Sequence, residues 1–148
     1  DLFDQVSTSN KSSFKVGGYT FSREYKEAVT LQDLFDAEKE ILNAFADEGS
    51  CVIAGRSAFF VLKDRPNKVD IFITASKEHR IERIMAKQGM TREEAINLME
   101  ETDKGRDNYV QRYTGLSRYD MRNYDIILDM DYLTEDEAVE KIVAFIGI

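Results

Sequence analysis

An arginine after a glycine, at the end of an apolar run, is the first residue here that could do chemistry. Residues 50–56 read S-C-V-I-A-G-R, and the apolar run 51–54 predicts a buried parallel strand. Gly55 permits a tight turn, which leaves Arg56 at the carboxyl end of the strand, where open α/β sheets bind ligands. Its guanidinium could hold a phosphate or carboxylate with two parallel hydrogen bonds, or pair with a neighbouring acidic residue. The residues alone leave both interpretations open.

A second basic set follows the apolar run V-D-I-F-I-T-A at residues 69–75. Arg80, Arg83 and Lys87 are spaced by three and four residues on the helix expected from Ser76, so they share one face. Spacing alone favours a solvated basic stripe over a binding surface.

A third basic set occupies residues 102–115, T-D-K-G-R-D-N-Y-V-Q-R-Y-T-G, and contains Lys104, Arg106 and Arg112. Gly105 within it costs about 1 kcal/mol in a helix relative to Ala, and predicts a bend. A mobile arm rich in Arg and Lys suits phosphoryl transfer, which is catalysed mostly by positioning and electrostatic stabilisation. A surface helix with alternating charges is the other interpretation.

Composition limits the remaining classes of function. The 148 residues are 43% hydrophobic and 32% charged, which is enough for one domain with a core, and the net charge of −8 argues against nucleic-acid binding through a general positive field. No apolar run reaches membrane-spanning length. The single cysteine, Cys51, is expected as a buried apolar filler in a cytoplasmic protein, and the single histidine, His79, as a surface residue. One of each also argues against a zinc site.

The elements that must position these residues alternate between strands and helices, which predicts one α/β domain with a parallel sheet. Residues 1–29 are expected to be irregular or mobile, with a turn at residues 17–18 and aromatic side chains that could anchor a partner, so that a homodimer is plausible. The last helix is expected to bury a stripe of apolar side chains: Val139, Ile142, Val143 and Ile146. The other expected elements are strands at 50–54, 69–75 and 124–130, and helices at 30–49, 57–62, 76–89 and 91–113.

Four motifs in order resemble the cytidylate kinase-like family of P-loop nucleoside monophosphate kinases, from about Leu31 to Ile146. The first is C-V-I-A-G-R-S-A, which resembles the family's strand ending in Gly-Arg, and the second is V-D-I-F-I-T-A-S-K-E-H-R-I-E-R-I. The third is the lid-like T-D-K-G-R-D-N-Y-V-Q-R-Y-T-G, and the fourth is N-Y-D-I-I-L-D followed by L-T-E-D-E-A-V-E-K-I. The resemblance implies a three-layer α/β/α fold with a parallel sheet, a lid at about 87–115, and an acceptor-side segment within residues 1–29.

The resemblance also implies an activity and its residues. The enzyme would transfer the γ-phosphoryl of ATP, with Mg²⁺, to a nucleoside monophosphate, CMP or dCMP above all. Arg56, with Gly55 and Ser57, would bind the acceptor. The clamp and lid would contain Arg80, Lys104 and Arg106, oriented by Asp103, with Arg83 and Arg112 as secondary candidates.

Two departures from the family pattern stand out. Ser57 follows the Gly-Arg where typical members have an Asp that helps to hold the acceptor nucleoside, so a non-nucleotide acceptor is a further possibility. No G-x-x-x-x-G-K-[ST] phosphate loop occurs in the sequence, and we expect an N-terminal segment with that loop outside the chain given. The alternative is a catalytically silent module that binds a nucleotide or a protein.

Overall fold

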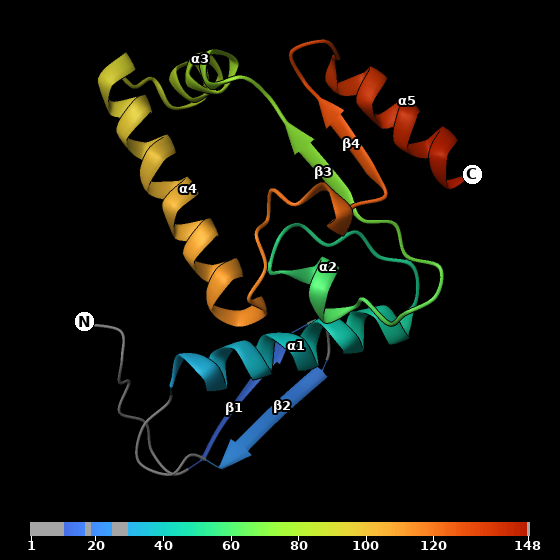
Figure 1. The fold of residues 1–148 in the computed structure, drawn as a ribbon. Coiled ribbons are helices and arrows are strands. Elements are labelled where there is room, and N and C mark those ends of the chain that lie inside the picture. Colours follow the sequence, from blue (N-terminus) through green and yellow to red (C-terminus); the bar gives the residue numbers. More distant parts are fainter. Residues whose placement is uncertain (1–10, 17–18, 25–29, 148) are drawn as a thin grey trace. The chain divides into compact units, whose positions relative to one another are not determined.

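A computed structural model describes residues 11–16, 19–24 and 30–147, and its elements are labelled in Figure 1. The chain forms two compact units, Asp1–Ala54 and Gly55–Ile148, which we describe separately. The helices are α1 (Leu31–Glu48), α2 (Ala58–Val61), α3 (Lys77–Gln88), α4 (Arg92–Thr114), the short η1 (Met121–Asn123) and α5 (Glu135–Ile146). The strands are β1 (Lys11–Val16), β2 (Tyr19–Glu24), β3 (Ile71–Thr74) and β4 (Ile126–Asp129).

The first unit contains a hairpin where irregular structure was expected. β1 and β2 pair antiparallel, from Lys11 opposite Glu24 to Val16 opposite Tyr19. Two runs of alternating character separated by two glycines are a hairpin signal, which the polar composition of the segment obscured. The turn expected at residues 17–18 lies outside the described residues. Thr30 caps the start of α1 as expected: its hydroxyl accepts from the Asp33 backbone N–H, and the Asp33 carboxylate accepts from the Thr30 N–H.

The strand predicted at 50–54 is wrong. Residues 51–54 have no regular structure, Cys51 is exposed rather than buried, and Val52 is fully exposed. An apolar run becomes a strand only where a neighbour satisfies its backbone donors and acceptors. In the described part of the chain, no strand pairs with this run.

The other two predicted strands are confirmed, and they form the parallel sheet of the second unit. β3 and β4 pair from Ile71 opposite Ile126 to Thr74 opposite Asp129. The chain between them contains α3 and α4, as a parallel crossover requires. The second unit is therefore mixed α/β with a small, two-stranded parallel sheet (Figure 1).

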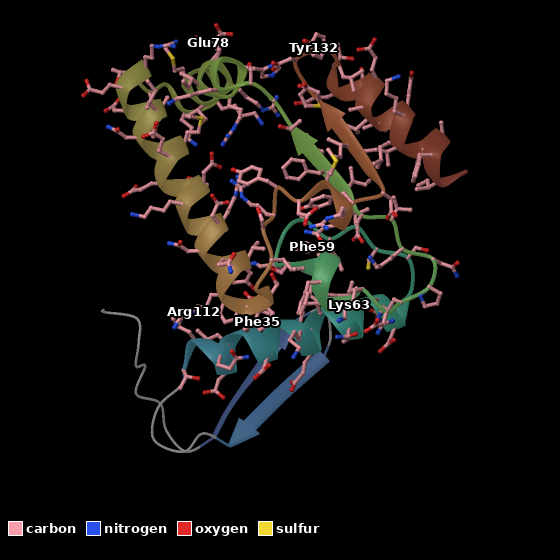
Figure 2. All side chains as sticks on the ribbon, in the orientation of Figure 1. Phe35, Phe59, Lys63, Glu78, Arg112 and Tyr132 are labelled. Carbon is pink, nitrogen blue, oxygen red and sulfur yellow. The ribbon has the colours of Figure 1, made fainter. Side chains whose placement is uncertain are left out.

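An aromatic cluster connects α2, the sheet and the segment after α4. Phe72 on β3 lies 4.9 Å from the ring of Tyr124, which in turn lies 5.6 Å from Phe59 on α2, and Figure 2 labels Phe59. Phe72 also meets the ring of Tyr119 edge-on at 6.1 Å. Such contacts fix the segment between α4 and β4 against the strand.

α3 and α4 pack through a small apolar core. Ile81 on α3 and Ala95 and Met99 on α4 are buried, and Ile84, Met85 and Ile96 surround them. α4 opens with a capping box between Thr91 and Glu94, as its sequence indicates, and continues through Gly105 as one helix. The basic residues of the second and third sets are thus carried by two helices in contact.

The apolar stripe expected on α5 is largely exposed. Ala138 is the buried residue of this helix, whereas Val139 and Phe145 are more than half exposed and Val143 and Ile146 are also exposed. Periodicity marks an apolar face, but burial needs a surface to cover it.

In the described part of the chain, no helix is long and apolar enough to cross a membrane.

Candidate functional site

The Gly-Arg-Ser segment forms a left-handed turn before α2. The φ angles of Gly55, Arg56 and Ser57 are 77°, 56° and 52°. The left-handed conformation costs a non-glycine residue roughly 1–2 kcal/mol, and such strain concentrates at functional sites. The turn is held by a hydrogen bond from the Ala58 N–H to the Gly55 carbonyl at 3.1 Å.

Within this turn, Arg56 and Ser57 have opposite surroundings. Arg56 is exposed, whereas Ser57 is buried, and its Oγ has no hydrogen-bond partner among the described residues. A buried hydroxyl without a partner is uncommon and calls for an explanation such as a water or a ligand. The turn therefore places an exposed guanidinium next to a buried hydroxyl that has no hydrogen-bond partner among the described residues.

The two sequence-predicted residues that the structure brings together are Arg80 and Asp103. Arg80 on α3 donates from its Nη2 to Oδ1 of Asp103 on α4 at 2.8 Å, and the same nitrogen lies 2.8 Å from Oδ2. The two side chains are 33% and 20% exposed, so the pair is shielded but reachable. A carboxylate held this way fixes the direction of the guanidinium.

A second arginine that the sequence analysis missed, Arg118, joins the same carboxylate. It lies after α4, donates to Oδ1 of Asp103 at 3.1 Å, and also bonds Asp107 one turn further along α4. Its guanidinium lies 4.4 Å from the centre of the Tyr119 ring and donates to the Tyr119 hydroxyl. The sequence indicates this residue only as one more cation just after the third basic set, in the connection between the helix expected at 91–113 and the strand expected at 124–130.

Electrostatics favour the ionised form of this cluster. Burial raises the pKa of Asp103, but the hydrogen bonds and charges of Arg80 and Arg118 outweigh it, so the pKa lies below its ordinary value. Burial likewise lowers the pKa of Arg118, while Asp107 and Asp103 more than compensate and raise it. Asp103 and Arg118 are therefore charged at neutral pH.

This shift predicts an acid-sensitive contribution to stability. Because the pKa of Asp103 is lower in the folded state than its unfolded value of about 3.9, ionised Asp103 stabilises the fold above about pH 4. That contribution is lost as the pH falls through the folded-state pKa. We expect the free energy of unfolding, measured by urea at pH 2–6, to fall less steeply below pH 4 in Asp103→Asn than in the wild type. Identical slopes would contradict the prediction.

The remaining predicted residues are dispersed. Lys104 and Arg106 are exposed on α4, and they form no ion pair with any residue that the structure describes. Arg83 pairs with Glu135 on α5 at 2.6 Å and lowers the pKa of that carboxyl, so its side chain links α3 to α5. Arg112, near the end of α4, is exposed (Figure 2).

The carboxyl ends of β3 and β4 are joined by a carboxylate. Asp131 accepts from the Ser76 backbone N–H at 2.9 Å and lies 3.3 Å from Nδ1 of His79, so His79 has a partner at the start of α3. Among the described residues, no group of three or more His, Cys, Asp or Glu side chains is arranged to hold a metal ion.

Comparison with known proteins places these elements in a family. The sequence profile described as the cytidylate kinase-like family matches residues 2–132. A protein named cytidylate kinase from Methanopyrus kandleri is 29% identical over 109 residues, which cover 68% of this chain and 56% of that protein. One of the same name from Pyrobaculum neutrophilum is 29% identical over 114 residues, covering 76% and 58%. The match thus spans a little over half the length of these curated relatives.

A solved structure is similar as well. The crystal structure of an uncharacterized protein from Eubacterium ventriosum superimposes with a TM-score of 0.74 at 31% identity, and the match covers 78% of this chain and 73% of that one. The profile match extends over most of the chain and includes the turn at Arg56, the Arg80–Asp103 pair and Arg118. The chain belongs to the cytidylate kinase-like family.

Proposed function

We propose that the protein containing this chain transfers the γ-phosphoryl group of ATP to a nucleoside monophosphate, with CMP or dCMP as acceptor. The observation that carries the proposal is the Arg80–Asp103 pair, which joins α3 to α4 in a family whose curated relatives are named cytidylate kinases. Arg80 remains one-third exposed while its direction is fixed, which suits a group that must meet phosphoryl oxygens.

The chemistry needs positive charge where negative charge is spread over the transferred group. Arg80 would supply one oriented guanidinium. Lys104 and Arg106, exposed on the adjoining helix and not neutralised by a described ion pair, would supply mobile charge to the phosphates. Asp103 would orient Arg80 rather than act as a general base, because two guanidiniums lower its pKa and make the carboxylate a weak base.

The acceptor would bind at the turn before α2. Arg56 would hold its phosphate with a two-pronged hydrogen bond, and the Ser57 hydroxyl would find there the partner that the described residues do not give it. A hydroxyl is a weaker hydrogen-bond acceptor than the Asp carboxylate of typical family members. We therefore expect the site to take monophosphates with a wider range of nucleobases.

ATP and Mg²⁺ enter this proposal through the family alone. Asp103 is already held by Arg80 and Arg118, and no described carboxylate cluster fits a metal ion, so no residue of the described part is assigned to magnesium. We also propose a single kinase-like domain with a three-layer P-loop architecture, a cytoplasmic location and a homodimer. The parallel pairing of β3 with β4 is consistent with such a sheet.

A second candidate is a module that binds a nucleoside monophosphate without transferring phosphate. The absence of a G-x-x-x-x-G-K-[ST] motif from residues 1–148 favours it. Titration calorimetry with CMP, dCMP, UMP, AMP and ATP, beside a coupled assay for ADP release, separates the two. Binding of a monophosphate with ADP release supports the kinase, and binding without ATP affinity or turnover supports the module.

Arg106→Ala tests the lid within this proposal. We expect kcat to fall about 100-fold, whereas the dissociation constant of CMP changes less than threefold, because Arg106 would meet the phosphoryl group mainly in the transition state. Arg112→Ala, another exposed arginine on α4, is the matched comparison and should lose much less. Full activity of Arg106→Ala would remove Arg106 from the site.

A further inference from the structure

Arg118 is a closely held cation of the second unit. Its side chain is only 15% exposed and bonds two carboxylates, Asp103 and Asp107, while its guanidinium carbon lies over the Tyr119 ring. The two carboxylates are four residues apart, so they lie on one face of α4, one turn from each other. A single guanidinium thus grips two successive turns of the helix.

The same residue also connects α4 to the sheet. Tyr119, which Arg118 both stacks on and hydrogen-bonds, meets Phe72 of β3 edge-on at an interplanar angle of 81°. Arg80 adds a second bond to Asp103, from α3. Arg118 therefore links a strand to the part of α4 where Lys104 and Arg106 lie.

We propose that Arg118 is a positioning residue that holds Asp103 against Arg80 and fixes this part of α4 to β3. Its consequence for catalysis rests on the proposed phosphotransfer, whereas its effect on α4 does not. Arg118 acts through Asp103 rather than on a phosphate, since its Nε and Nη2 already donate to Asp107, Asp103 and Tyr119 and its side chain is about half as exposed as that of Arg80.

Charge balance allows the geometry of Arg118 to be tested separately from its charge. Arg80 and Arg118 offset Asp103 and Asp107, so the cluster is neutral, and removal of Arg118 leaves one excess negative charge beside Arg80. Arg118→Lys keeps the charge but loses the planar fork, which two carboxylates and a ring require. Arg118→Met combined with Asp107→Asn keeps the cluster neutral and also loses the fork. If geometry is what matters, both variants fail alike.

Hydrogen exchange of the backbone amides of residues 103–110 in the unliganded protein tests the brace directly. We expect exchange to accelerate about tenfold in both variants, and kcat to fall about tenfold with the KM for CMP changed less than threefold. Arg122→Lys is the control, because Arg122 also pairs two-pronged with a carboxylate, Asp120, but is 86% exposed and ties only its own loop.

Unchanged exchange in α4 overturns the proposal, as does acceleration equal to that of the Arg122 control. If the wild type neither binds CMP nor releases ADP, the proposed function fails, and the exchange result alone then decides whether Arg118 braces the helix. If the wild type is active and Arg118→Lys retains full kcat, the positioning role fails although the proposed function stands.

Discussion

Arg56→Ala is expected to weaken CMP binding about 100-fold and to lower kcat/KM by at least as much. A charge-assisted hydrogen bond contributes about 1.5–3 kcal/mol, and a guanidinium that grips a phosphate makes two of them, so a loss of about 3 kcal/mol is a conservative expectation. Arg56 is exposed in a turn and contributes little to the core, so the fold should survive. Titration calorimetry and the coupled assay give the two quantities.

Two comparisons make this test specific. Arg56→Lys keeps the charge but not the fork and should recover only part of the affinity. Lys63→Ala removes another exposed cation just after α2 and should leave CMP binding unchanged. An Arg56→Ala protein that binds CMP as tightly as the wild type would take Arg56 out of the acceptor site, whatever the outcome for the lid.

Ile81→Ala is expected to reduce the free energy of unfolding by about 3 kcal/mol, within the range of 2–5 kcal/mol typical of such deletions. Ile81 is 1% exposed and packs with Ala95 and Met99 in the core between α3 and α4, so truncation of its side chain leaves a cavity there. A loss of that size is a large fraction of the stability of an ordinary domain. Urea unfolding followed by circular dichroism measures it.

Val139→Ala is the matched control, because it also shortens a β-branched residue on a helix but at a position 58% exposed in the structure. It should change the free energy of unfolding by well under 1 kcal/mol. Equal losses in the two variants would mean that the α3–α4 core is not where the stability of the second unit resides.

The predictions that rested on local sequence patterns were the most accurate. α4 and α5 begin with capping boxes, Thr91 with Glu94 and Thr134 with Glu137, whose spacing is visible in the sequence because the two residues of each box are three positions apart. The strands at 71–74 and 126–129 were likewise visible as short apolar runs with turn residues beside them. In each case the sequence pattern and the stabilising contact occupy the same few positions.

Predictions that depended on distant partners did less well. The run 51–54 has the composition of a strand but no described neighbour, and the stripe at Val139 and Val143 has the period of a buried face but no described cover. Arg118 was missed because its carboxylates precede it by 11 and 15 residues, beyond the reach of helical periodicity. Only folding of the segment after α4 back onto that helix brings them together.

The parallel pairing of β3 with β4 also sets an order of events during folding. The contacts that open this sheet join residues 55 positions apart, whereas Ile81 and Ala95 meet across one short connection between α3 and α4. Closing the longer loop costs about 1 kcal/mol more chain entropy, and nonlocal pairing slows folding. The helical pair that carries Arg80 and Asp103 is therefore expected to assemble early, with registration of the strands as the slow step.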